Sequence, residues 1–459
     1  MTTSAIFHAI WTALGGDVED CNRVTLTTDG ALPSVLPVTE LASTSMAAVA
    51  LAIARLRAQS SGTPVEQVIV DRRLASMWFA TSLRPIGWQL PNPWDPIAGD
   101  YKTQDGWIRL HTNAPHHRVA AESILGAHTD RAEMAKAVAL WKKAELETAI
   151  VQAGGCAAEM RSIAEWSQHP QGRAIAAEPL IHIDRRSPAN APPNTPAHSV
   201  DPSRPLAGIK VLDLTRVLAG PVATRCLAAY GAQVLRIDPP SWNEPALVPE
   251  VTPGKRLARL DLRDQAALAT LKALITSADV LLHGYRPGAL EHLGLGSAVR
   301  QQINPALIDV SLSAYGWTGP WRDRRGFDSL VQMSSGIAHA GMQHAQADKP
   351  VPMPVQALDQ ATGYLMAAAA IVGITEHLQS KTVLQARVSL ARTAQLLIDH
   401  QTDTRHPAFS SETGADKSES IEHTQWGDAQ RIQWPIQIKG CPVHWATPAR
   451  ALGSDTARW

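Results

Sequence analysis

The sequence lacks the charge, cysteine and sorting signals that identify several protein classes. Lysine and arginine together number 42, as do aspartate and glutamate, so the formal net charge is zero. The absence of a basic excess argues against nucleic-acid binding, and no acidic block predicts a disordered tail. The cysteines lie far apart at no metal-ligand spacing, which favours reduced, buried thiols and no metal site. They are Cys21, Cys156, Cys226 and Cys441.

Membrane signals are missing as well. The first residues, MTTSAIFHAIWTALGGD, contain no cationic region before an apolar core, so no signal peptide is predicted. The most apolar stretches, 45–56 and 363–374, are rich in alanine and too short to cross a bilayer. We therefore expect a cytoplasmic protein with no membrane partner, and its 459 residues suffice for two or three domains.

A proline-rich stretch divides the chain. Residues 187–205 hold six prolines and almost no large apolar side chain, which predicts an extended linker. The predicted organisation is a helical and small-domain part over 1–183, a linker over 184–205, a strand–helix domain over 206–396, and a polar loop with a closing tail over 397–459.

Residues 1–183 carry local helix and strand patterns. The clearest are an alanine-rich helix over 43–59, an alternating strand over 105–113, and helices over 115–125 and 129–151. The adjacent His116 and His117 would lie on two faces of a helix, which favours a solvated pair over a metal site.

From residue 206 strands and helices alternate. Apolar runs of strand length occur at 209–215, 232–238, 278–284 and 306–316. Such alternation predicts an α/β, doubly wound parallel sheet with ligand bound at the carboxyl ends of the strands. The first turn reads TRVLAGP and not GxGxxG, so the fingerprint of a nicotinamide dinucleotide site is absent. The segment 402–429 is polar and reads as a long loop, followed by one or two strands in the tail.

Asp359 stands in VPVQALDQATGYLMAAAAIVG, between an extended segment and a helix of small residues. An aspartate there can be the N-cap of the helix, since its carboxylate accepts hydrogen bonds from free N–H groups and complements the dipole. The alternative is a nucleophilic carboxylate, which the local residues alone do not establish.

The motifs from residue 205 onward resemble the family III CoA-transferases, which include formyl-CoA transferase, carnitine CoA-transferase and α-methylacyl-CoA racemase. They are PLAGIKVLDLTRVLAGPVATRCLAAYGAQVLRIDPP, RLARLDLRD, DVLLHGYRPGALEHLGLG and SAYGWTGPWRDRRGFDSLVQMSSG, in the family's order. The resemblance implies a Rossmann-like CoA-binding domain over 206–396 and a smaller α+β domain. It also implies coenzyme A as the carrier, in an acyl-CoA, and no metal.

Residues 1–183 resemble the same family out of order. SMAAVALAIARLRAQSSGTPVEQVIVD is similar to the helix and strand that follow the family's catalytic Asp, and residues 363–397 carry a second version. We infer a tandem duplication trimmed on both sides, which leaves about one complete fold. Glu40 lies near the Asp position of the front copy, in imperfect register and with a longer side chain, so a second nucleophile is not expected.

By the resemblance, Asp359 is the nucleophile that forms an anhydride and then a thioester with CoA. A carboxyl with a reference pKa of about 3.9 is ionised at neutral pH, and the helix dipole favours that form. Residues at the family's CoA-contact positions are Thr215, Arg216, Val217, Leu218, Leu260, Arg263, Gly284, Tyr285, Arg286 and His292. Arg263 keeps the positive charge that a 3′-phosphate requires.

Several positions depart from the family's pattern. Leu218 replaces a polar amide, Gly284 a common Asn, Ser313 a Lys and Pro239 an Arg. These replacements predict looser CoA binding or a changed substrate. Phe327 stands where the racemases carry a His, and the missing imidazole base argues against racemisation.

We therefore expect CoA transfer between an acyl-CoA and a carboxylic acid. An inactive CoA-binding relative and a racemase or dehydratase acting on acyl-CoA are the alternatives. Family members interlock as homodimers, and the rearranged order leaves open whether one chain does the work of two.

Overall fold

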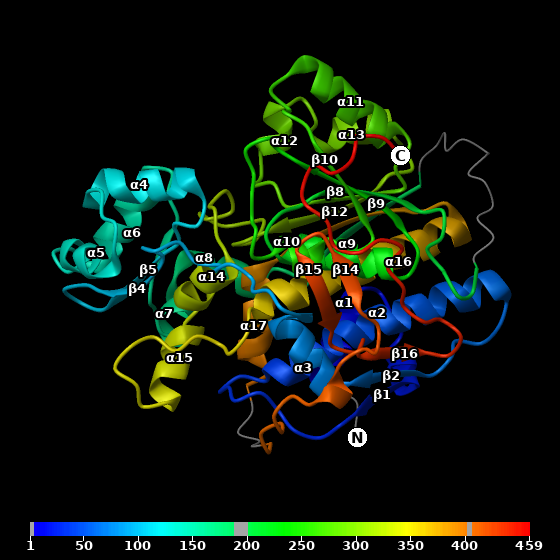
Figure 1. The fold of residues 1–459 in the computed structure, drawn as a ribbon, viewed down its shortest axis with the longest axis horizontal. Coiled ribbons are helices and arrows are strands. Elements are labelled where there is room, and N and C mark those ends of the chain that lie inside the picture. Colours follow the sequence, from blue (N-terminus) through cyan, green and yellow to red (C-terminus); the bar gives the residue numbers. More distant parts are fainter. Residues whose placement is uncertain (1–3, 188–200, 402–405) are drawn as a thin grey trace.

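A computed structural model describes residues 4–187, 201–401 and 406–459 (Figure 1). Its centre is a seven-stranded sheet in the order β10-β9-β8-β11-β12-β13-β7, parallel except for β7, which runs antiparallel to β13. The strands are β7 His182–Arg186, β8 Lys210–Leu214, β9 Gln233–Asp238, β10 Lys255–Arg259, β11 Val280–His283, β12 Ile308–Ser313 and β13 Val383–Ser389. The predicted α/β fold class is confirmed.

Helices cover both faces of this sheet, which explains why its inner strands β8, β11 and β12 are almost wholly buried. Val211 belongs to the core that includes α9, α2 and α16, whereas the next residue, Leu212, belongs to the core beneath α11. The helices α11, α12 and α13 lie on one face, and α9 and α16 on the other (Figure 1). Their bounds are α9 Ala219–Ala229, α11 Gln265–Thr276, α12 Ala289–His292, α13 Ser297–Ile303 and α16 Ala357–Ser380.

Two long helices pack along each other through the middle of the molecule. They are α2 (Val38–Ser61) and α16, each of 24 residues. The sequence-based prediction of stretches too short to span a bilayer was wrong, because both helices are long and apolar enough. The fold buries 83% and 94% of their most apolar windows, however, as expected for core helices.

The two long helices begin and end alike. The residues before them, Pro37 and Gln356, have φ/ψ of −76°/59° and −77°/65°, and each helix ends at a residue in the left-handed region, Gly62 or Lys381. A strand and a helix follow each: β2 (Val68–Asp71) and α3 (Arg72–Ala80) in front, β13 and α17 (Leu390–Asp399) behind. This shared order supports the inferred duplication.

The last residues complete sheets begun by the first. Strand β16 (Ile436–Ile438) pairs with β2, which pairs with β1 (Val24–Thr27), and β15 (Gly427–Arg431) joins β3 (Leu83–Pro85) to β14 (Glu422–Thr424). The prediction of a long loop over 402–429 is therefore corrected, although 402–405 lie outside the described residues. Shorter elements nearby are α1 Ala5–Ala13, η1 Val18–Arg23, α10 Val248–Val251 and η2 Gly414–Asp416.

A smaller α+β lobe has a core of its own. Its antiparallel sheet is β4 Gly99–Lys102, β5 Trp107–Leu110 and β6 Ala157–Glu159, and its helices are α4 Pro115–Leu125, α5 Arg131–Val138 and α6 Lys143–Gln152. The helices α7 Ile163–Gln168 and α8 Pro170–Ala177 follow the lobe and bury Trp166 and Ile175 in the main core. The helix predicted over 129–151 is thus two. His117 is buried beside Cys156 while His116 is exposed, so the two do not form a solvated pair.

Two helices from the second half reach this lobe or the helix that follows it. They are α14 (Asp328–Ser334), which contacts β5 and β6, and α15 (Ile337–His344), which contacts α7. The predicted division at a linker stays a prediction. Residues 184–186 lie in β7 and not in a linker, and 188–200 lie outside the described residues.

Candidate active site

Asp359 is the third residue of α16 and is 7% exposed. Because α16 leads into the start of the parallel strand β13, its own first turn lies toward the carboxyl ends of the strands. Among the residues that the structure describes, none donates a hydrogen bond to the Asp359 side chain. The backbone of α16, and not a hydrogen bond to the side chain, therefore determines where this carboxyl group lies.

Asp359 is not the N-cap of its helix. The N-cap residue is Gln356, whose side chain makes no capping bond. The carboxylate of Asp328, from α14, accepts hydrogen bonds from the backbone N–H groups of Leu358 at 2.9 Å and Asp359 at 3.0 Å. The N-cap interpretation was wrong because a residue from another helix caps α16.

The two carboxyls share a buried, acidic environment. Burial raises the pKa of Asp359 well above its usual value, and the charge of Asp328 raises it further. Burial also raises the pKa of Asp328, but hydrogen bonds from Gln332 and from the backbone of α16 oppose that effect. The proton of the pair therefore resides first on Asp359. The expectation that the helix dipole keeps Asp359 ionised is corrected, because burial and Asp328 outweigh it.

Side chains from the front half stand beside this pair. Arg109, on β5, lies close enough to lower the pKa of Asp328. His111, just after β5, stacks on Phe327 with ring centroids 3.7 Å apart. Burial lowers the pKa of His111 to about 3, so this imidazole is neutral.

Helix α9 approaches α16 closely one turn after Asp359. A Cβ on Gly363 would lie 2.3 Å from the carbonyl oxygen of Ala219, the first residue of α9. Only glycine allows this approach. It brings the turn that precedes α9, residues 215–218, next to the start of α16.

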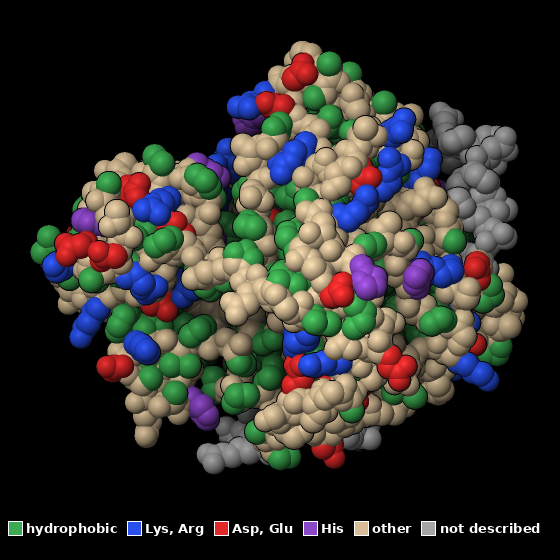
Figure 2. Space-filling model, in the orientation of Figure 1, with side chains coloured by type: hydrophobic (Ala, Val, Ile, Leu, Met, Phe, Trp, Pro, Cys, Tyr) green, Lys and Arg blue, Asp and Glu red, His purple; other side chains and the backbone are tan. Residues whose placement is uncertain are grey.

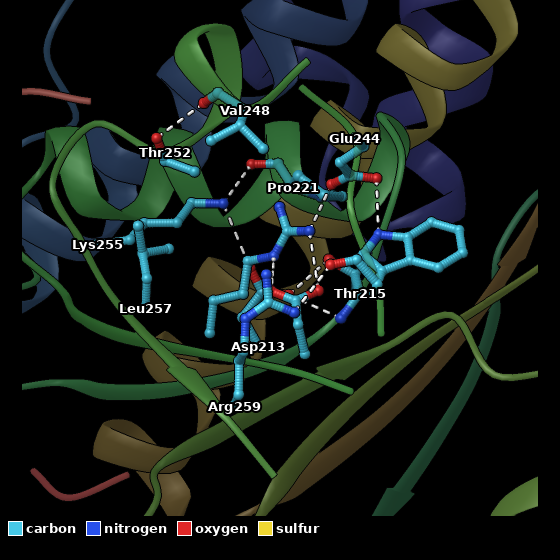
Figure 3. A network of polar contacts seen from close by, with 12 residues as sticks. Asp213, Thr215, Pro221, Glu244, Val248, Thr252, Lys255, Leu257 and Arg259 are labelled. Carbon is cyan, nitrogen blue, oxygen red and sulfur yellow. Dashed lines mark hydrogen bonds and ion pairs between the residues drawn. The ribbon is translucent and has the colours of Figure 1, made fainter. Parts of the chain in front are cut away.

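A buried network supports that turn (Figure 3). Asp213 accepts hydrogen bonds from the backbone N–H and the hydroxyl of Thr215, so this hydroxyl is already used. Glu244 accepts the N–H of Val217 at 2.9 Å. Val217 has φ +67°, which a β-branched residue rarely adopts and which needs such support. Lys255 bonds Thr224 and the carbonyl of Pro221, and burial lowers its pKa to about 7.

Arg216 lies between two aromatic rings at the carboxyl edge of the sheet. Its guanidinium carbon is 4.8 Å from the ring centroid of Trp242 and 5.3 Å from that of Tyr285. The structure thus brings together Arg216 and Tyr285, two of the residues predicted from the sequence. A cation over aromatic faces at a strand end suits recognition of an anionic nucleotide.

The other predicted CoA contacts differ in exposure. Leu218 is buried, Leu260 is half-buried, and the exposed residues are Arg263, Gly284, Arg286 and His292. The Arg263 side chain is 86% exposed and is paired with Asp261 at 2.6 Å. All follow strands β8, β10 or β11, so they lie along one edge of the sheet.

A second site lies at the start of α2. Glu40 is the third residue of α2, as Asp359 is of α16, so the predicted imperfect register was wrong. Arg72 pairs with Glu40 at 2.6 Å. A cavity of about 1450 Å³ opens here, and its lining includes both residues and His400.

Sequence reasoning missed Asp328, Trp242, Glu244 and the two front-half residues Arg109 and His111. The motif GFDSL contains Asp328, but from the sequence we considered a role only for its neighbour Phe327. Trp242 and Glu244 lie in a loop with no strand or helix pattern.

Positive and negative side chains are interspersed over the face shown in Figure 2.

Comparisons with known proteins identify the family. Residues 206–456 match the family described as CoA-transferase family III. An acyl-CoA transferase of Gibberella moniliformis is 30% identical over 301 residues, which cover 60% of this chain and 52% of that protein. The succinyl-CoA:glutarate CoA-transferase of Mus musculus is 33% identical over 195 residues, 40% of this chain and 44% of that protein.

Among solved structures, the crystal structure of a hypothetical protein of Mycobacterium tuberculosis is 32% identical and covers 42% of this chain and 55% of that chain, with a TM-score of 0.37. The chain spans about half the length of the relatives it matches. The family match covers more than half of the 459 residues. The chain belongs to CoA-transferase family III.

Proposed function

We propose that the protein transfers CoA from an acyl-CoA to a carboxylic acid, with Asp359 as the nucleophile. The observation that carries the proposal is the Asp359 carboxyl itself, which is buried at the carboxyl edge of the sheet and receives no hydrogen bond from any residue in the described ranges. An unengaged carboxylate is free to form a bond to carbon, and a covalent intermediate divides acyl exchange into easier steps.

The proposed reaction balances in four steps. The Asp359 carboxylate attacks the thioester carbonyl, and the C–S bond breaks to give an anhydride and CoA thiolate. The thiolate attacks the aspartyl carbonyl, which releases the donor acid and leaves an aspartyl-CoA thioester. The acceptor carboxylate then attacks this thioester, and the released thiolate attacks the acceptor's carbonyl in the new anhydride. Acceptor acyl-CoA leaves, and the Asp359 carboxylate is regenerated.

The chain's own residues would serve two tasks. The strand-end residues Arg216, Tyr285 and Arg263 would bind the nucleotide part of CoA, because they offer two cations and an aromatic face. The approach of α9 to Gly363 would bring that binding edge to the nucleophile. Asp359 must lose its proton before it attacks, so the rate should fall as pH falls through its raised pKa.

Trapping tests the proposal. The protein is incubated with succinyl-CoA or acetyl-CoA, quenched with hydroxylamine or borohydride, and mapped by mass spectrometry. We expect modification at Asp359 alone, about one per chain, and none in Asp359→Asn. Undiminished transfer by Asp359→Ala would refute the assignment of the nucleophile.

The replaced contacts at Leu218 and Gly284 favour one alternative, a CoA-binding protein without transfer. In that case calorimetry would detect CoA binding, while no acyl-CoA would label Asp359.

The number of chains needed for one site is a separate question, because α2 of the front copy packs on α16 within one chain. We propose that a single chain carries one complete site in place of a homodimer, which light scattering combined with label stoichiometry tests. The cytoplasmic location stays a prediction.

A further inference from the structure

Asp328 is almost fully buried, at 1% exposure, and both of its carboxylate oxygens are used. Oδ2 accepts the backbone N–H groups of Leu358 and of Asp359 itself. Oδ1 accepts a hydrogen bond from the side-chain amide of Gln332 at 2.5 Å. One carboxylate thus binds the first turn of α16 directly.

Gln332 extends the same anchor to the segment before α16. Its carbonyl oxygen accepts the N–H of Met353 at 2.8 Å. Asp328 and Gln332 lie one turn apart on α14, so this short helix holds the chain at residue 353 and again at 358–359. The segment that delivers Asp359 is therefore fixed at both ends to one rigid element.

We propose that Asp328 is a positioning residue for Asp359, which orients the first turn of α16 and hence the nucleophilic carboxyl, with Gln332 as its brace. This inference rests on the proposed function of Asp359. Both Asp328 oxygens already accept hydrogen bonds and the side chain is 1% exposed, so Asp328 acts through Asp359 and not on the substrate. Misplacement of a reacting group by about 1 Å can cost roughly 100-fold in rate.

The charges around Asp359 define a second effect of Asp328. From α14, Asp328 faces Asp359, and from β5, Arg109 faces Asp328. On α2, Glu40 is paired with Arg72, and on α9, Arg225 faces Tyr364 and Glu250. Asp328 is therefore the charge whose removal should act most directly on the protonation of Asp359.

Asp328→Asn changes both effects without changing the shape. The Asn carbonyl oxygen can still accept hydrogen bonds from the backbone N–H groups of Leu358 and Asp359. Its NH₂ group then faces the NH₂ group of Gln332, and two donors cannot bond each other. Gln332 must turn over, and its own NH₂ then faces the N–H of Met353. One of the two anchors is lost. Gln332→Leu removes the same brace while the Asp328 charge stays.

The test compares Asp328→Asn, Asp328→Ala and Gln332→Leu with the wild type. The control is Asp130→Asn, because Asp130 also accepts two backbone N–H groups, at the start of α5 in the other lobe. Labelling of Asp359 by acetyl-CoA and steady-state CoA transfer (kcat and KM) are measured from pH 4 to 9, together with amide exchange of the peptide 353–360.

For Asp328→Asn we expect kcat to fall about 10- to 100-fold, with KM changed less than about threefold. The acid limb of its pH profile should move to lower pH, because the neighbouring charge no longer raises the pKa of Asp359. Gln332→Leu should lower kcat without that movement, and Asp328→Ala should speed exchange at 353–360 most.

Two results would overturn the inference. One is an Asp328→Asn protein that matches Asp130→Asn in labelling rate and pH profile. The other is exchange of 353–360 at the wild-type rate in Asp328→Ala. If the wild type itself is never labelled, the proposed function fails, and amide exchange alone then decides whether Asp328 anchors α16.

Discussion

The helices α2 and α16 each carry an acidic residue at the third position, but the charges next to the two residues have opposite signs. Glu40 meets a cation, since Arg72 pairs with it at 2.6 Å and is itself buried. Asp359 meets another carboxyl, Asp328, and within the described part of the chain no side chain or N–H group donates a hydrogen bond to it. A paired carboxylate is stabilised and poorly nucleophilic, whereas an unpaired one keeps its lone pairs available. The neighbours, and not the helix, distinguish a structural carboxylate from a candidate nucleophile.

The largest expected effect is on covalent chemistry. Asp359→Ala should lower CoA transfer by at least about 1000-fold, as removal of a nucleophile does. Glu40→Ala, the same change at the matching position of α2, should leave labelling of Asp359 in place. Transfer by an acyl-CoA assay and mass spectrometry measure both. Equal losses in the two variants would remove the distinction between the sites.

The next effect is on packing. Gly363→Ala places a Cβ 2.3 Å from a backbone oxygen of α9, so α9 or α16 must shift, at a cost of about 1–3 kcal/mol. The corresponding residue of α2 is Thr44, which already carries a side chain, and Thr44→Ala should cost less. Urea unfolding compares the two. A Gly363→Ala protein as stable as Thr44→Ala would show that the approach of α9 is relaxed in solution.

A smaller effect is expected on the free energy of unfolding when Glu40 or Asp359 is replaced. Glu40→Gln leaves Arg72 without its partner and should cost about 1–2 kcal/mol, less than a fully buried pair, since the Glu40 side chain is 20% exposed. Asp359→Asn should act in the opposite direction. A carboxyl whose pKa is raised on folding contributes stability at low pH, which is lost as pH rises through its folded pKa.

Thermal unfolding from pH 4 to 9 checks both variants. The Tm of Asp359→Asn should exceed that of the wild type increasingly as pH rises, while Glu40→Gln should have the lower Tm near neutrality. A pH-independent difference for Asp359→Asn would show that its carboxyl titrates in the folded protein as it does in the unfolded chain.

The smallest expected effect is on CoA binding at the carboxyl edge of the seven-stranded sheet, where the predicted CoA contacts all come from the second half of the chain. Arg263→Ala should weaken CoA binding by several-fold, because an exposed cation contributes little. The same variant should bind 3′-dephospho-CoA as the wild type does. Calorimetry with both ligands is the measurement, and an equal loss for both would place the 3′-phosphate elsewhere.

Local patterns predicted much of the fold. The buried strand β11 is an apolar run, and α4 has the predicted bounds because Pro115 starts it and Gly126 follows it. The strands β14 and β15 escaped prediction, since they are short and polar, and β15 pairs on its other side with β3, more than 300 residues away.

The candidate site was predictable only in part. The family motifs point to Asp359 and to the strand-end residues. The cap from Asp328 joins two helices through tertiary contact, and Arg109 arrives from the other half of the chain, so neither has a local signal. The matching register of Glu40 was hidden because the residues after it share few identities with those after Asp359.

The pairing of α2 with α16 has a consequence for synthesis of the chain. Helix α2 is mostly buried in the folded protein, yet its partner is translated about 320 residues later, roughly 15 to 60 s at ribosomal speed. Strand β2 waits longer still for β16. Until then the emerging half exposes a surface that favours aggregation, so this protein should depend on chaperones during translation more than one whose halves fold in turn.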